Sequence, residues 1–240
     1  MKKIDDLIES ERHRFVDGVQ LSGFVTSWQA VDRYHTFLTL LMESEAKATQ
    51  TYSEKLKAWM GTPLSPSQHL TEEQQHRLAE DRKAADVLHL EIESYYLFSK
   101  ILLDTVARAI EKHFGQVRKC SLDSHHDLVN KFGKYTELKK LVIPSGFMEK
   151  AVWLKKNISD FRDYEIAHDK RLNRVTATAL TRDGRATMIA TSTVVPAERF
   201  KPQADSTHVS ELMAAVGDYI VAAIEIVKTN RNKTKLKLVD

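Results

Sequence analysis

The chain has 240 residues, of which 42% are hydrophobic and 29% charged, with a formal net charge of +3. This composition is typical of a globular protein with its own core, and the mild charge does not by itself indicate a nucleic-acid binder. The single cysteine, Cys120, excludes an internal disulfide and favours a cytoplasmic location. No run approaches the roughly 18 apolar residues of a membrane span, and the N-terminus lacks a signal-peptide core, so we expect no membrane partner.

Helical periodicity dominates the first part of the chain. Residues 4–15 and 28–60 have the spacing of helices, and the glycine and prolines of residues 61–66 break the pattern. Thr71 is followed three residues later by Gln74, which resembles a capping box and predicts the start of a long helix.

That long helix is expected to end at Gly115, a residue typical of a helix C-terminus. Residues 92–110 within it are apolar nearly all round, which predicts a central, buried helix. Lys100, Asp104 and Arg108 form one polar strip at four-residue spacing. We interpret this strip as structural ion pairing rather than as a catalytic site.

The second half begins with a predicted helix over residues 124–141, and Pro144-Ser145-Gly146 separates it from the next helix. An apolar stripe at three- and four-residue steps predicts that this next helix faces the core. The stripe comprises Phe147, Ala151, Leu154, Ile158 and Phe161, and extending it by seven residues reaches His168.

After Asn173 the pattern alternates around Asp183-Gly184, which predicts a β-hairpin at about 174–196. A last helix is expected over 206–229, followed by a basic, loosely ordered tail at about 230–240. Without repeats or low-complexity linkers, the sequence predicts a single domain, residues 1–240: a mainly α-helical bundle with an appended hairpin.

The common nucleotide-binding, zinc-protease and cysteine-cluster motifs are missing from the sequence. A metal-binding alternative comes from two E-x-x-H pairs, Glu73 with His76 and Glu165 with His168, because di-iron helical bundles use this pairing twice. Such ligands must project into a dry bundle core, and Glu73 and His76 lie in a segment that is polar on every face. We therefore expect no metal and no cofactor.

A second pattern lies in "DFRDYEIAHDKRL", residues 160–172, where Arg162 and Asp163 precede His168. This arrangement resembles the R-x4-6-H motif of the HEPN superfamily, whose domains are helical bundles with the motif at the end of a core helix. The resemblance covers about residues 72–174 and the last helix, and the predicted hairpin departs from it. It implies an HEPN-like antiparallel bundle.

The resemblance implies a metal-independent endoribonuclease, a toxin or phage-defence effector, with Arg162, His168 and Asp163 as catalytic residues. Residues 131–174 contain 11 Lys or Arg against 6 Asp or Glu. A solvated helix surface is the more common explanation of such a window, but if a polyanion binds anywhere, this segment is the first candidate. The expected RNA-binding residues beside the motif are Tyr164, Lys170, Arg171 and Arg174. A purely structural alternative remains, in which His168 is a core residue and Arg162 pairs with Glu165 and Asp169 on the helix surface.

Partners follow from the geometry of the motif. Six helical residues rotate by about 600°, so Arg162 and His168 point about 120° apart, and one chain presents them poorly to one phosphate. We therefore expect a homodimer that shares one cleft. The resemblance implies an antitoxin or nucleotidyltransferase as a further partner. The alternative function is a non-catalytic HEPN module that binds nucleotide or RNA or dimerises with another protein.

Overall fold

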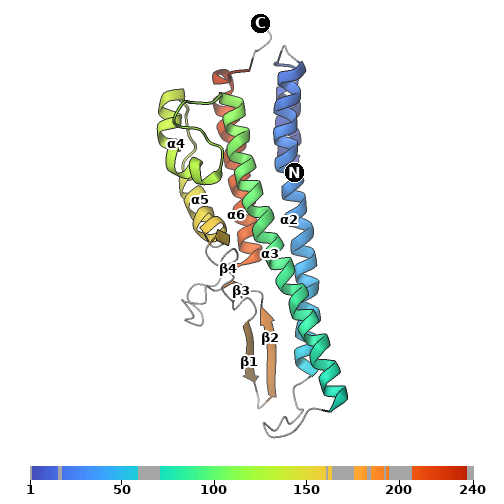
Figure 1. The fold of residues 1–240 in the computed structure, drawn as a ribbon. Coiled ribbons are helices and arrows are strands. Elements are labelled where there is room, and N and C mark those ends of the chain that lie inside the picture. Colours follow the sequence, from blue (N-terminus) through green and yellow to red (C-terminus); the bar gives the residue numbers. More distant parts are fainter. Residues whose placement is uncertain are drawn as a thin grey trace. The chain divides into compact units, whose positions relative to one another are not determined.

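The computed structural model in Figure 1 is mainly helical. It describes residues 2–15, 18–58, 71–160, 162–163, 176–182, 185–191, 193–194 and 207–236. Among these residues, no helix combines the length and apolar character needed to cross a membrane.

Three helices form the first part of the chain: α1 (Lys2–Glu11), α2 (Gly18–Ala58) and α3 (Glu72–Phe114). The predicted capping box at the start of α3 is confirmed: Thr71 Oγ1 accepts the Gln74 N–H at 3.2 Å, and Gln74 Oε1 accepts the Thr71 N–H at 2.9 Å. The predicted end is also confirmed, because Gly115 has a φ of 87°. Helices α1 and α2 begin before the predicted residues, and residues 61–66 lie outside the described part.

Four helical segments follow: α4 (His125–Lys139), α5 (Phe147–Leu154), the π-helix η1 (Lys155–Asp160) and α6 (Val209–Thr229), with the 3-10 helix η4 (Arg231–Lys233) after α6. Helix α4 begins at a side-chain cap, because Ser124 Oγ accepts the Asp127 N–H at 3.1 Å. Phe147, Ala151, Leu154 and Ile158 are fully buried, which confirms the predicted stripe for these four residues. Phe161 lies outside the described residues.

The strands are short. Strand β1 (Thr176–Arg182) pairs antiparallel with β2 (Arg185–Thr191), from Thr176 opposite Thr191 to Arg182 opposite Arg185, and β3 (Thr193–Val194) pairs antiparallel with β4 (Thr207–His208). The turn at Asp183-Gly184 lies outside the described residues, so the hairpin as a whole stays a prediction.

The chain divides into two compact units, and the boundaries fall inside the long helices. Unit 1 comprises Met1–Thr39, Tyr96–Tyr164 and Glu211–Asp240; unit 2 comprises Leu40–Tyr95 and Glu165–Ser210. Helices α2 and α3 each contribute residues to both units, so neither unit consists of its own set of helices and strands. The single domain stays a prediction.

The core of unit 1 is aromatic where α4, α5 and α6 meet. The Phe147 ring stacks on Tyr219 at 5.2 Å and contacts Phe132 at 5.2 Å between centroids. At the far end of α3, His113 lies among the rings of Phe24 and Phe114. These contacts fix α5 against α4 and α6, and so fix where the chain leaves α5 toward Arg162.

In unit 2, the two long helices are joined by polar contacts. Ser44 of α2 donates to Glu91 of α3 at 2.8 Å, and Lys55 pairs with Glu80 at 3.2 Å. Several large apolar side chains of this unit remain exposed: Leu40, Val87 and Leu90 are 56%, 44% and 62% accessible.

Candidate functional site

The residues around Arg162 lie at the end of the helix that begins with α5. This helix widens into the π-helix η1, and Arg162 and Asp163 lie in the same kind of turn. A π-helix has i→i+5 hydrogen bonds, is rare, and occurs mostly as short insertions in α-helices, frequently at functional sites. The widening precedes Arg162, so the backbone leading to the motif is not a regular α-helix.

Arg162 is held by its neighbour. Its Nη1 donates to Asp163 Oδ1 at 2.8 Å, and the two side chains are 36% and 48% exposed. A guanidinium has five N–H donors, and the contact with Asp163 occupies one of them. The pair therefore has the form of a positioned guanidinium that retains donors for a phosphate or a carboxylate.

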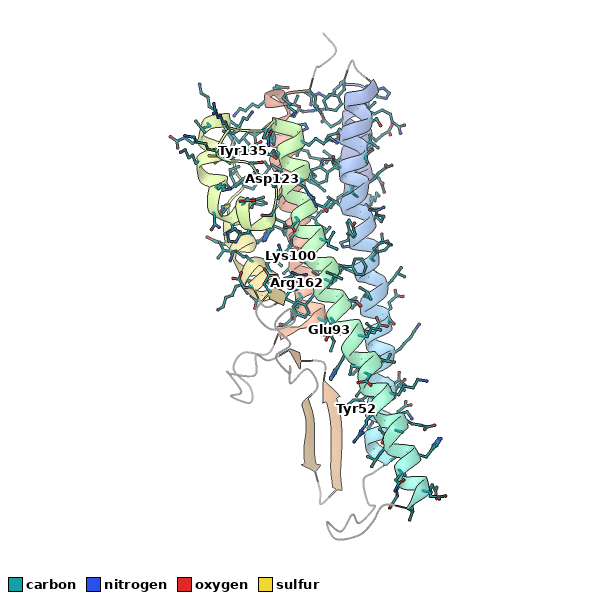
Figure 2. The ribbon with its side chains drawn as sticks, viewed as in Figure 1. Tyr52, Glu93, Lys100, Asp123, Tyr135 and Arg162 are labelled. Carbon is teal, nitrogen blue, oxygen red and sulfur yellow. The ribbon has the colours of Figure 1, made fainter. Side chains whose placement is uncertain are left out.

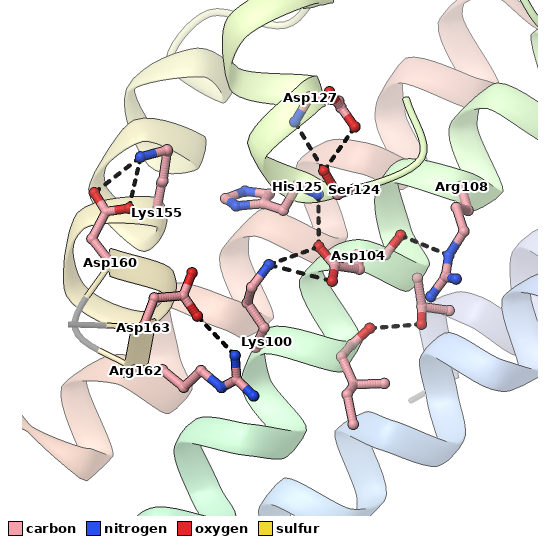
Figure 3. Close-up of polar contacts among 12 residues, drawn as sticks. Lys100, Asp104, Arg108, Ser124, His125, Asp127, Lys155, Asp160, Arg162 and Asp163 are labelled. Atoms are coloured by element: carbon pink, nitrogen blue, oxygen red, sulfur yellow. Dashed lines mark hydrogen bonds and ion pairs between the residues drawn. The ribbon is translucent and has the colours of Figure 1, made fainter. Parts of the chain in front are cut away.

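Two further ion pairs flank this one in unit 1 (Figure 3). Lys155 Nζ lies 2.7 Å from Asp160 Oδ1, and Lys100 Nζ lies 3.3 Å from Asp104 Oδ1. The side chains of Lys155 and Lys100 are 20% and 17% exposed, less than that of Arg162. Each of these three cations thus has a carboxylate partner, so the three pairs together carry little net charge.

Asp104 also joins α3 to α4. Its Oδ1 accepts the backbone N–H of His125 at 2.8 Å, in the first turn of α4. Arg108 donates through Nε to the Asp104 backbone carbonyl at 3.3 Å instead of pairing with the carboxylate. Each residue of the polar strip Lys100, Asp104 and Arg108 therefore bonds to the helix itself or to α4, in keeping with its interpretation as structural.

His125 is a buried histidine that the sequence did not single out. Its ring is fully buried, makes an edge-to-face contact with Tyr219 at 5.4 Å, and neither nitrogen has a hydrogen-bond partner in the described part of the chain. Burial, together with the positive charges of Lys100 and Lys155, lowers the pKa of His125 to about 3. A histidine that is neutral throughout the physiological range is a poor proton donor at neutral pH, so His125 is not a candidate general acid.

Tyr219 shares this buried environment on α6. Its hydroxyl has no hydrogen-bond partner among the described residues, and burial raises its pKa. Tyr219 lies three residues after Val216 and next to Ile220 on the apolar face of α6, so helical spacing accounts for its burial, whereas nothing in the local sequence marks His125 as buried.

The other predicted site residues lie outside the described part of the chain. They are His168, Tyr164, Lys170, Arg171 and Arg174. The structure therefore brings together Arg162 and Asp163 alone, and the geometry between Arg162 and His168 stays a prediction.

Of the two E-x-x-H pairs behind the metal-binding alternative, Glu73 with His76 lies within the described residues. Glu73 and His76 are exposed on α3, and His76 Nδ1 lies 3.9 Å from Glu80. Within the described ranges, no three His, Cys, Asp or Glu side chains gather as a metal site. An exposed pair on a polar surface lacks the enclosed ligand set of a di-iron bundle.

The chain matches no protein-family model, no curated protein and no solved structure.

Proposed function

We propose that this protein is a metal-independent endoribonuclease of HEPN type, a toxin or phage-defence effector. The observation that carries the proposal is Arg162 on a π-helical turn, oriented by Asp163 and partly exposed. The mainly helical fold and the R-D-x4-H pattern of residues 162–168 support it. The proposal assumes an HEPN-like antiparallel bundle with the hairpin at 174–196 appended to it.

The proposed reaction uses the nucleophile of the RNA itself. The 2′-oxygen forms a bond to the adjacent phosphorus while the bond from phosphorus to the 5′-oxygen breaks, which leaves a 2′,3′-cyclic phosphate and a 5′-hydroxyl. His168 exchanges protons at neutral pH, because an imidazole has an ordinary pKa near 6.5. It accepts the 2′-OH proton or protonates the leaving oxygen, and in a dimer two His168 residues are present for the two tasks.

Arg162 acts on the charge that builds up at phosphorus. Its planar guanidinium donates two parallel hydrogen bonds to phosphate oxygens, which a point charge does not reproduce. Asp163 holds the guanidinium through the 2.8 Å contact and leaves donors for the phosphate. Tyr164, Lys170, Arg171 and Arg174 would contact the neighbouring nucleotides.

The test is cleavage of single-stranded RNA by the purified full-length protein in EDTA. We expect products that end in a 2′,3′-cyclic phosphate, and we expect DNA of the same sequence to survive because it lacks the 2′-OH. Cleavage of the DNA, or a requirement for added Mg²⁺, would contradict the mechanism.

The proposal includes a homodimer, in which two motifs face one cleft and present an arginine and a histidine to the same phosphate. Light scattering at micromolar concentration should give about twice 27.4 kDa. A mass of 27.4 kDa would remove the basis for a shared site.

A non-catalytic HEPN-type module that dimerises with another protein is the second candidate. The observation that favours it is the exposure of Leu40, Val87 and Leu90 in unit 2, beside a groove lined by Ala48, Thr51 and Val87. A protein that never cuts RNA but co-purifies with a partner, and loses it on Leu90→Glu, would support this function.

A further inference from the structure

The basic tail after α6 is fastened to unit 1 at two places. Asn230 Nδ2 donates to the Val142 carbonyl and its Oδ1 accepts the Val142 N–H, both at 2.7 Å. Further on, the Lys235 N–H and the Thr234 hydroxyl both donate to the His113 carbonyl, at 3.0 and 2.9 Å. The tail through Lys235 therefore has a defined path along the ends of α3 and α4.

This path brings lysines of distant segments together over Gly115. A Cβ atom on Gly115 would lie 2.7 Å from Lys235 Cδ and 3.2 Å from Lys139 Nζ. Lys140 follows directly at the end of α4, and Arg118 and Lys119 lie in the turn after Gly115. We refer to Arg118, Lys119, Lys139, Lys140 and Lys235 as the basic surface.

The cations of the basic surface have no ion-pair partner among the described residues. Nearby carboxylates are engaged elsewhere: Glu111 accepts from Ser121 and from the Leu122 N–H, and Glu11 pairs with Arg14 and Arg231. Glu137 is exposed two residues before Lys139 and offsets one charge. The basic surface thus keeps a clear positive excess.

Cations at helix C-termini also have a purely structural use, because they interact with the helix dipole and the last carbonyls. Lys233 has this use, since its Nζ donates to the Lys140 carbonyl. The side chains of Lys139, Lys140 and Lys235 make no such bond among the described residues. Lys140 and Lys235 are exposed and Lys139 is partly exposed, so their charges are not used up in capping.

We propose that the basic surface binds the phosphodiester backbone of RNA, as a docking site separate from Arg162; the choice of RNA rests on the proposed function. Lysines that neutralise phosphates release condensed counterions, which supplies sequence-independent affinity. Because the tail is already fixed by Asn230 and His113, little ordering entropy is lost when the RNA binds.

The distance between the two sites sets a length of RNA. Helix α4 has 15 residues and runs from the Asp104 contact, beside Lys100, to Lys139, a rise of about 22 Å. Figure 3 shows Arg162 in the region of Lys100. At about 3.4 Å per stacked nucleotide, some six nucleotides are needed to reach from one site to the other. A dinucleotide substrate therefore occupies only the Arg162 site.

The test measures RNA binding without cleavage, on the full chain carrying His168→Ala. A fluorescent 12-nucleotide single strand is titrated by anisotropy against this protein and against the same protein with Lys119, Lys139, Lys140 and Lys235 all changed to Gln. We expect affinity to fall on the order of 10²-fold at 0.15 M salt. The slope of log K against log salt should become shallower by about 3, at about 0.7 per phosphate contact.

The matched control removes the same charge elsewhere, by changing Lys2, Lys3, Lys47 and Lys57 to Gln. These side chains are exposed and make no ion pair among the described residues. Affinity should remain within a few-fold of the parent. An equal loss in the control, or no loss in the first variant, overturns the proposal. Unchanged melting temperatures show that both variants fold.

Two further outcomes separate this proposal from the proposed function. If the wild-type protein never cuts RNA but binds it through the four lysines, the ribonuclease fails and the docking site stands. If RNA is cut and the four changes leave KM for a 12-nucleotide substrate unaltered, the docking site fails alone. Binding to phosphatidylserine vesicles through these lysines, with no RNA binding, would assign the surface to a membrane and overturn the proposal.

Discussion

Two regions of unit 1 differ in whether their cationic side chains are paired with carboxylates. Around Arg162, three cations have a carboxylate within 3.3 Å: Asp163 for Arg162, Asp160 for Lys155 and Asp104 for Lys100. On the basic surface at Gly115, no cation has an ion-pair partner among the described residues. Figure 2 shows Arg162 and Lys100 in one part of unit 1 and Tyr135, which donates to the Gly115 carbonyl, in another.

The difference teaches what each arrangement is suited for. A paired guanidinium is fixed in orientation and carries little net field, which suits a directional contact with one phosphate. Unpaired lysines keep their full charge and reach a polyanion at long range without requiring a fixed geometry. Under the proposed function, the Arg162 region would carry out the chemistry and the basic surface would attract the RNA.

The largest expected effect tests the chemistry of the Arg162 region. His168→Ala should lower kcat for RNA cleavage by about 10²–10⁴, because it removes a proton-transfer group. Arg162→Lys should also lose most activity, since an ammonium cannot replace the bidentate fork. Single-turnover kinetics and melting temperature are measured together. If both variants melt far below wild type and wild type never cuts RNA, the pair is structural.

Separate measurements of KM and kcat distinguish the basic surface from the Arg162 region. Lys139→Gln with Lys140→Gln should raise KM for a 12-nucleotide RNA several-fold and leave kcat unchanged, because these residues act in binding alone. The same variant should cut a dinucleotide as wild type does. A fall in kcat on the dinucleotide would place these lysines in the chemistry and end the division of tasks.

A buried histidine lies near each region, His125 near Arg162 and His113 near the basic surface. Both should make the free energy of unfolding depend on pH in the same direction. Burial lowers the pKa of His125 to about 3 and that of His113 to about 4. Below pH 6.5 the unfolded chain binds a proton at each ring while the folded protein does not, so the free energy of unfolding falls as the pH is lowered. The expected slope is about 1.4 kcal/mol per pH unit for each histidine.

Urea unfolding between pH 7 and pH 5 measures this slope. His125→Phe and His113→Phe should each flatten it, because phenylalanine stays neutral and suits the aromatic surroundings. His13→Gln, on an exposed side chain, is the matched control and should leave the slope as in wild type. An unaltered slope in both phenylalanine variants would show that these rings do not control acid stability.

The smallest expected effects concern the contacts that hold α4 to α3. Asp104→Ala removes the acceptor of the His125 N–H and the partner of Lys100, and should cost about 1–3 kcal/mol. Asp104→Asn keeps an acceptor and should cost less. Ser124→Ala removes the cap of α4 and should cost about 1 kcal/mol. Denaturant midpoints rank the three; an Asn variant as unstable as the Ala variant would assign the loss to charge.

Local signals in the sequence determined most of the helical architecture. The Thr71–Gln74 box and Gly115 bounded α3 because capping is a matter of neighbouring residues, and the stripe from Phe147 to Ile158 predicted its own buried face. Arg162 and Asp163 were named instead through the resemblance to a sequence motif, and the 2.8 Å contact between their side chains is a finding of the structure.

Other features depended on packing between segments far apart in the chain. The meeting of Lys139 with Lys235 over Gly115, and the Asn230 contacts with Val142, join residues that no periodicity relates. The buried ring of His125 and the π-helix before Arg162 likewise have no local signature. Helix signals act over a few residues, whereas the charge pairing and burial of a side chain depend on which helix packs against it, and only the tertiary structure decides that.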